Sequence, residues 1–107
     1  MKQWDIFLYK FEEEKPHYVV IVSSQARIDA GNPINGLFCR TIRAAKPIRF
    51  NEVPLDRVDG FDWSTGVVCD FFYQLDPKKF LEKQGEVSYE RRRQISRKIY
   101  ETLRLVS

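Results

Sequence analysis

Four basic residues in the middle of the chain have a spacing that points to a chemistry. They recur every three positions with no acidic residue between them: Arg40, Arg43, Lys46 and Arg49. Such a cluster suits a polyanion, because each phosphate that a cation neutralises releases condensed counterions. A solvated face that binds nothing carries similar charge in many proteins. Two interpretations therefore stay open here, a nucleic-acid contact and an ordinary charged surface.

Asp70 is a second candidate, because it is a single carboxylate inside the apolar run 66–73. An unpaired charge is costly to bury, so this side chain must be paired, hydrogen-bonded or open to a groove. A structural ion pair with Arg40 or Arg43 would satisfy it. A carboxylate that opens into a groove would instead be available as a general base.

The only histidine and several aromatic residues extend the list of binding candidates. Histidine is the residue type that titrates nearest to neutral pH, and His17 follows a loop that could border a groove. A surface histidine without a role also fits that position. Tyr18, Phe38 and Trp63 could stack on unpaired RNA bases. Core packing is the simpler interpretation for Tyr18 and Phe38, whereas Trp63 lies in a polar loop.

The motifs of several enzyme classes are missing from the sequence. It has no glycine-rich phosphate loop, no G-x-S-x-G and no H-E-x-x-H, and one histidine excludes any site that needs two. The acidic residues lie mainly in loops, which disfavours a two-metal nuclease. We therefore expect no metal and no cofactor. RNA can be cut without a metal, because its 2′-hydroxyl is an internal nucleophile once a base, an acid and cations surround it.

Length and composition predict the kind of protein that positions these residues. The chain has 107 residues, 43% of them hydrophobic and 14% aromatic, which predicts one domain over residues 1–107 with a packed core. No apolar run approaches the roughly 20 residues that a membrane span needs, and the first residues lack the order of a signal peptide. We expect a cytoplasmic protein with no membrane contact. Cys39 and Cys69 are expected to be buried, reduced thiols.

The hydrophobic pattern predicts a mainly β protein with a C-terminal helix. Ser88 precedes an amphipathic segment in which Ile95, Ile99 and Leu103 share one side, extended by Tyr89 and Arg92, with most other cations outward. A short helical turn is expected over 77–81, closed by Gly85. Turn-forming residues predict loops at 12–16, 27–36 and 56–65. Strands are expected at 4–11, 18–22, 37–43, 66–73 and, as short pieces, 48–50 and 53–55.

Five segments in this order resemble the PemK/MazF family of toxin endoribonucleases. They are WDIFL at 4–8, KPHYVVIVS at 15–23, LFCRT at 37–41, NEVPL at 51–55 and GVVCD at 66–70. DGFDW at 59–63 and ERRRQI at 90–95 look like a subgroup, and the similarity spans about the whole chain. The resemblance implies a compact, curved β-barrel of SH3-like type. It also implies a homodimer with an RNA groove at its interface, and an antitoxin whose acidic or amphipathic tail covers that groove.

The resemblance also implies three catalytic residues, Lys15, Thr41 and Asp70. Lys15 stands where the family usually has an arginine before the proline of the second strand, so it keeps the charge without the bidentate fork. Thr41 matches the family's hydroxyl, within a window that also contains Arg40. Asp70 matches an aspartate of the fourth motif. Val68 and Cys69 precede it, so no second catalytic arginine is assigned there.

These observations lead to two functional hypotheses. The first is a metal-independent endoribonuclease that cleaves single-stranded RNA through its 2′-hydroxyl, with Lys15, Thr41 and Asp70 as catalytic residues. RNA would also contact five further residues: His17, Arg40, Arg43, Lys46 and Trp63. The second is a non-catalytic toxin or binding module on the same fold that inhibits a protein target. We expect the homodimer to form near residues 37–42.

Overall fold

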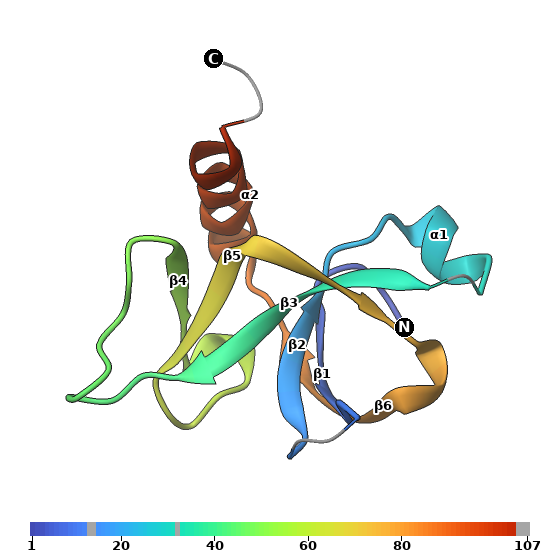
Figure 1. Ribbon diagram of the computed structural model, residues 1–107, viewed down its shortest axis with the longest axis horizontal. Helices are drawn as coiled ribbons and strands as arrows, with labels where there is room; N and C mark the ends of the chain where they lie inside the picture. Colours follow the sequence, from blue (N-terminus) through green and yellow to red (C-terminus); the bar gives the residue numbers. More distant parts are fainter. Residues whose placement is uncertain (13–14, 32, 105–107) are drawn as a thin grey trace.

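Six strands form one antiparallel sheet within residues 1–12, 15–31 and 33–104, which the computed structural model describes. The sheet is strongly curved, and its spatial order is β4-β5-β3-β2-β1-β6 (Figure 1). The mainly β fold with a C-terminal helix is therefore confirmed. The strands are β1 (Asp5–Tyr9), β2 (His17–Ile21), β3 (Ile34–Thr41), β4 (Glu52–Leu55), β5 (Thr65–Leu75) and β6 (Phe80–Glu86).

Helical segments connect and cover these strands. The longest, α2 (Tyr89–Leu103), packs against β4 and β5 (Figure 1). The others are α1 (Gln25–Asp29) and two short 3-10 turns, η1 (Arg57–Asp59) and η2 (Pro77–Lys79). None of the helices in the described part of the chain is long and apolar enough to cross a membrane.

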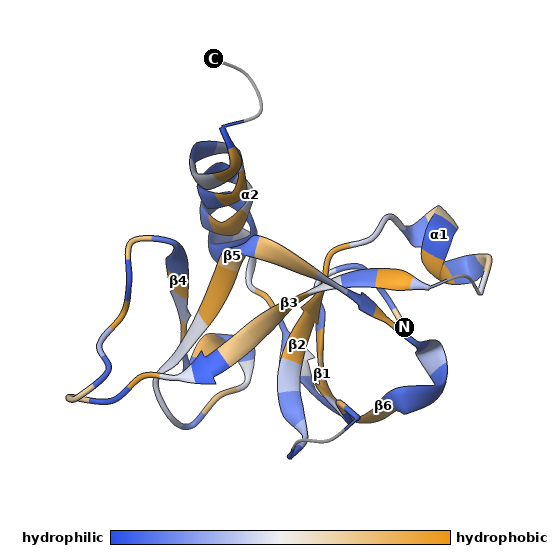
Figure 2. Ribbon diagram, viewed as in Figure 1, coloured by the Kyte–Doolittle hydropathy of each residue, from blue (hydrophilic) through white to orange (hydrophobic). Residues whose placement is uncertain are grey.

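Apolar residues cover both faces of the central strands. Val20 and Leu37 belong to the cluster that also contains Ile95 of α2, whereas Val19 and Ile21 belong to a second cluster. Successive strand residues point to opposite faces, so the near-continuous run at 18–22 supplies both clusters, as predicted for a buried strand. Figure 2 shows hydrophobic residues along β1, β2, β3 and β5, and hydrophilic residues in β6.

β5 bends where its pairing with β3 slips. Leu37 lies opposite Phe72, but Cys39, two residues further along β3, lies opposite Val67. The intervening residues of β5, 68–71, therefore have no regular partner on β3. A bulge of this kind bends a strand and redirects its side chains. Asp70 lies in this bulge.

Three of the predicted elements differ from the structure. The expected loop at 27–36 begins within α1, whose N-cap Ser24 accepts a hydrogen bond from the Arg27 N–H, and ends in β3. The segment 48–50 is not a strand. The helical turn expected at 77–81 stops at Lys79, and β6 follows it as an edge strand paired with β1. Charged residues are typical of an edge strand, and they disguised β6 in the sequence.

Gly85 does not close a helical turn as expected but allows two segments to cross. A Cβ atom at this position would overlap the carbonyl oxygen of Asp59 in η1. Asp59 is buried, and its carboxylate accepts hydrogen bonds from the Ser88 N–H at 2.8 Å and the Asp56 N–H at 3.0 Å. Gly85 and Asp59 therefore set where α2 begins.

The predicted apolar side of α2 is confirmed for Ile95, which is buried, and for Ile99, which packs on the same cluster. Tyr89 was expected on that side but is exposed. The Arg92 guanidinium lies 4.7 Å from the Tyr89 ring centre and donates to the Val87 carbonyl at 2.7 Å. These contacts hold Tyr89 against the first turn of the helix instead of the sheet.

Candidate nucleic-acid interface

The connection between β3 and β4, residues 42–51, is an exposed basic loop. Arg43, Lys46 and Arg49 are all exposed on it. A tight turn shapes its first part, where Arg43 and Lys46 exchange backbone hydrogen bonds of 3.2 and 2.9 Å. Phe50 is 81% exposed near its end. Cations interleaved with an exposed aromatic ring are typical of surfaces that bind single-stranded nucleic acids.

Arg40 lies beneath this loop, and its guanidinium is bonded to protein groups. It donates to the backbone carbonyls of Lys46 at 2.9 Å and Pro47 at 2.5 Å. It also forms a two-pronged ion pair with Glu52. Its side chain is 15% exposed. The sequence hypothesis that Arg40 pairs with Asp70 is wrong, because its carboxylate partner is Glu52.

Glu52, the first residue of β4, is the buried acid under the basic loop. Its side chain is 1% exposed and accepts from the Arg49 N–H at 2.7 Å as well as from Arg40. Burial raises the pKa of Glu52, but the hydrogen bonds from Arg40 and Arg49 outweigh it, so the pKa lies below its usual value. The sequence analysis did not single out Glu52. The signal was an acid three residues after the last of four regularly spaced cations, at the next position of the same spacing.

Asp70 anchors the end of the same loop. Its Oδ1 accepts a hydrogen bond of 3.0 Å from Asn51 Nδ2, and the Cys69 N–H donates to the Asn51 carbonyl at 2.9 Å. Asp70 is exposed. Its carboxylate is therefore solvated and needs no buried cation as a partner.

Thr41 and Trp63 lie where the basic loop begins. Thr41 is exposed and pairs with Thr65 across the β3–β5 ladder. The Ile42 N–H donates to the Ser64 carbonyl at 2.9 Å, which places the segment containing Trp63 beside the start of the loop. Trp63 is 39% exposed, and its ring lies 5.3 Å from that of Phe61. Part of the Trp63 side chain is therefore open to solvent.

The three predicted catalytic residues come from three different segments of the chain. Asp70 lies five residues along β5 from Thr65, the partner of Thr41, and within the bulge at 68–71. Lys15 is exposed just before β2. Because β2 and β3 are antiparallel, Lys15 and Thr41 belong to the same end of the sheet. The paired residues of these strands end at Val19 and Phe38, and beyond them the strands diverge (Figure 1).

A row of aromatic rings lies on the sheet face that also carries Arg40. The His17 ring is 4.8 Å from Phe38, which lies 6.0 Å from Tyr73, and Tyr73 lies 4.9 Å from Phe71. Phe38 and Arg40 are two residues apart on β3, so they share a face. Phe71 is 58% exposed at the end of the row. Phe38 is thus part of a half-buried aromatic face, whereas Tyr18 packs on the core cluster under α2.

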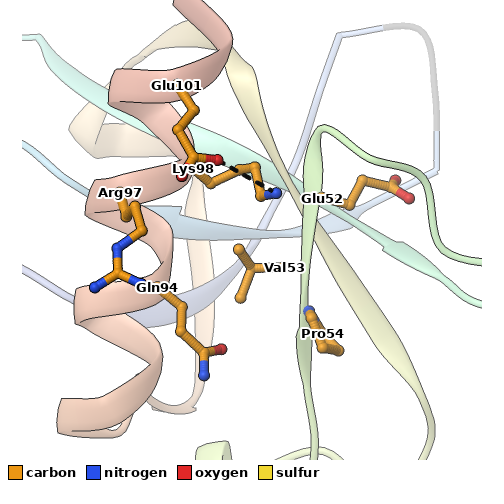
Figure 3. A pocket seen from close by; sticks show the side chains of 7 residues that line it. All are labelled: Glu52, Val53, Pro54, Gln94, Arg97, Lys98 and Glu101. Carbon is orange, nitrogen blue, oxygen red and sulfur yellow. Dashed lines mark ion pairs between the residues drawn. The ribbon is translucent and has the colours of Figure 1, made fainter.

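A separate hollow of about 380 Å³ lies between α2 and β4 (Figure 3). Val53 points toward the helix, and Lys98 forms an ion pair of 3.8 Å with Glu101 (Figure 3). Arg97 and Gln94 line the helix side. Lys98 of this hollow is therefore paired with an acid on its own helix.

The two cysteines are free and buried, as predicted. Burial raises the pKa of Cys69 to about 12 and that of Cys39 further. Neither thiol is therefore a nucleophile at neutral pH. Within residues 1–12, 15–31 and 33–104, no group of three or more His, Cys, Asp or Glu side chains could hold a metal ion.

Solved structures share this fold, although no protein-family model and no curated protein sequence matches the chain. The Mycobacterium tuberculosis toxin MazF-mt6 has a TM-score of 0.80 and 17% identity, covering 96% of this chain and 99% of that one. A mycobacterial endoribonuclease in complex with its cognate antitoxin has a TM-score of 0.84 and 17% identity, covering 100% and 98%. Another mycobacterial endoribonuclease has a TM-score of 0.81 and 17% identity, covering 100% and 94%. The fold that the PemK/MazF resemblance implies is therefore confirmed.

Proposed function

We propose that this chain is a metal-independent endoribonuclease of a toxin–antitoxin pair, a single domain over residues 1–107 that acts in the cytoplasm. The observation that supports this proposal best is an exposed basic loop beside an aromatic face, on the fold of MazF-type toxins. One fold hosts many functions, so the residues of this surface have to carry the activity.

Single-stranded RNA would lie across the basic loop and the aromatic face. Arg43 and Lys46 would neutralise phosphates. Phe71 and Trp63 expose ring surface on which unpaired bases would stack. His17 would contribute to RNA binding as a member of the aromatic row, in which its ring lies 4.8 Å from that of Phe38.

The reaction would use the 2′-hydroxyl of the RNA as its nucleophile. A general base takes the hydroxyl proton, and the oxygen attacks the adjacent phosphorus. The bond from phosphorus to the 5′ oxygen breaks, and that oxygen takes up a proton. The products are a 2′,3′-cyclic phosphate and a 5′-hydroxyl. Lys15 would stabilise the charge that develops on the phosphate, and Thr41 would hold a phosphate oxygen or orient the 2′-hydroxyl.

Asp70 would serve as the general base across a homodimer interface. Within one chain, Asp70 lies five residues along β5 from Thr65, the β3–β5 ladder partner of Thr41, so the two residues occupy different points along that pair of strands. A second copy docked near residues 37–42 would bring the two together. β3 is hydrogen-bonded to β2 and β5, so that copy would contact exposed side chains and flanking loops rather than the strand backbone.

An antitoxin is the proposed protein partner. One of the solved structures with this fold is described as an endoribonuclease in complex with its cognate antitoxin. For this chain, an acidic segment would complement the basic loop and compete with RNA for it.

The test is RNA cleavage by the purified chain in excess EDTA, on unstructured RNAs of varied sequence. We expect cleavage with cyclic phosphate and 5′-hydroxyl ends, and its loss in the nearly isosteric variant Thr41→Val. The absence of product from every RNA would contradict the proposal and favour a binding module that inhibits a protein. Light scattering that shows only a monomer of 12.7 kDa at micromolar concentration would remove the homodimer.

A further inference from the structure

Arg40 and Glu52 form hydrogen bonds with each other and with the backbone at the base of the basic loop. We call this pair of residues the clamp. A guanidinium has five N–H donors. Those of Arg40 are distributed over two oxygens of Glu52 and the carbonyls of Thr41, Lys46 and Pro47. No two-pronged edge of Arg40 is left for a phosphate.

Glu52 holds the other end of the loop. It accepts from the Arg49 N–H at 2.7 Å, and its own N–H donates to the Arg49 carbonyl at 3.1 Å. The clamp therefore holds the backbone of the loop at Lys46, Pro47 and Arg49, while the side chains of the loop cations stay exposed. The charge of Arg40 is balanced from below, and the cations above it remain exposed.

We propose that Arg40 and Glu52 are positioning residues that fix the basic loop in its RNA-binding conformation, and that Arg40 does not itself bind phosphate. This inference rests on the proposed function and names how its RNA surface is held. A loop held in its bound conformation loses less conformational entropy when RNA binds.

The proposal and simple electrostatics predict opposite signs for one substitution. Glu52→Gln removes a negative charge next to the basic loop, so electrostatic attraction alone would tighten RNA binding. If Glu52 holds the clamp, the same change releases the loop and weakens RNA binding. We expect a loss of about 2- to 10-fold in affinity, the cost of ordering one or two side chains anew.

The matched control is Glu82→Gln, which changes the net charge equally. Glu82 is exposed on β6, at the opposite edge of the sheet from β4. We expect RNA affinity in this variant to equal or slightly exceed that of the parent. RNA affinity is measured on a 2′-O-methyl oligonucleotide, which lacks the nucleophile and is not cut.

Limited trypsin digestion reports on the clamp without RNA. Arg43 and Arg49 lie in the loop, whereas the bond after Lys46 precedes Pro47 and resists trypsin. We expect faster cleavage after Arg43 and Arg49 in Glu52→Gln, and in Arg40→Lys, than in the parent or Glu82→Gln. An unchanged digestion rate would overturn the clamp. If Glu52→Gln is digested faster but the parent neither binds nor cuts RNA, the clamp is supported and the proposed function is contradicted.

The parent protein offers a readout that needs no variant to fold. The Arg40 Nε–H is bonded to Glu52, so its NMR signal should keep its position when the 2′-O-methyl oligonucleotide is added, while signals of Arg43 and Arg49 move. Movement of the Arg40 signal to that of a phosphate-bound guanidinium would overturn the proposal. So would RNA affinity that rises in Glu52→Gln.

Discussion

The basic loop and helix α2 are both rich in cations, but they present their charges differently. On α2, Arg91 lies 3.4 Å from Asp56 and Lys98 lies 3.8 Å from Glu101. In the described part of the chain, no ion pair includes Arg43 or Lys46 of the loop. Glu52, the acid under the loop, is buried and paired with Arg40. Two cations of the helix are therefore paired with exposed acids, whereas the acid under the loop is paired with Arg40 and leaves Arg43 and Lys46 exposed.

The largest effect on cleavage is expected from substitutions of the proposed catalytic residues. Asp70→Asn should lower turnover by roughly 100-fold or more, the usual contribution of a general base, while RNA affinity is kept. Thr41→Val should also be inactive, and mixing the two variants should restore part of the activity in mixed dimers. Single-turnover cleavage rates measure both.

A different outcome for Asp70→Asn would reassign this residue. A lower melting temperature with an unchanged rate per folded molecule would leave Asp70 only as the anchor of Asn51. His17 would then be the next candidate for the base.

Charge reversal compares the two basic regions directly. Arg43→Glu with Lys46→Glu should weaken RNA binding by about 100-fold and lower the salt slope by about 1.4, for two lost phosphate contacts. Arg93→Glu with Arg97→Glu on α2 should cost less than about 10-fold. Titrations at several salt concentrations measure both pairs, and equal losses would remove the distinction between loop and helix.

Lys15 is a proposed catalytic cation outside the basic loop, so its variants separate a role in catalysis from a role in binding. Lys15→Ala should reduce both RNA affinity and turnover by about 10-fold, because a cation at the scissile phosphate acts in both the ground and transition states. Lys15→Arg should match or exceed the parent activity through bidentate contact. Steady-state kinetics of the two variants check this. A rate in Lys15→Ala equal to that of the parent would place Lys15 outside the site.

The smallest expected effect concerns stability and pH. Hydrogen bonds hold the pKa of Glu52 below its ordinary value of 4.5 in the folded protein. The stability this provides is complete above that value and lost as the pH falls through the lower, folded-state pKa. The melting temperature of the parent should therefore fall more on acidification than that of Glu52→Gln. Parallel curves from about pH 7 to about pH 3 would contradict this.

The strand pattern of this chain could be predicted where burial alone determines it. β1, β2, β3 and β5 follow from apolar, β-branched runs, because their residues pack on both faces of the sheet. β6 could not be predicted, since an edge strand of charged residues depends on its partner β1. Helix α1 was not predicted, because its N-cap Ser24 lies just before the turn-forming residues of the expected loop at 27–36.

The candidate site was predictable as a set of residue types but not as an arrangement. The spacing of the loop cations pointed to a polyanion surface, yet no spacing distinguishes Arg40, which lies under the loop, from the exposed cations above it. That distinction needs Glu52, which comes from another strand. The bulge at 68–71 moves Asp70 away from the ladder partners that regular pairing would give it. Pairing register, rather than composition, decides which residues meet.

The crossing of Gly85 over Asp59 has a genetic consequence. If the chain is a toxin, cells that lose their antitoxin survive only when the toxin gene is inactivated. Any side chain at position 85 would collide with the Asp59 carbonyl and displace the start of α2. Every single-base change at the first or second position of a glycine codon introduces such a side chain or a stop. Codon 85 should therefore recur among survivors, although Gly85 itself is not proposed to touch RNA.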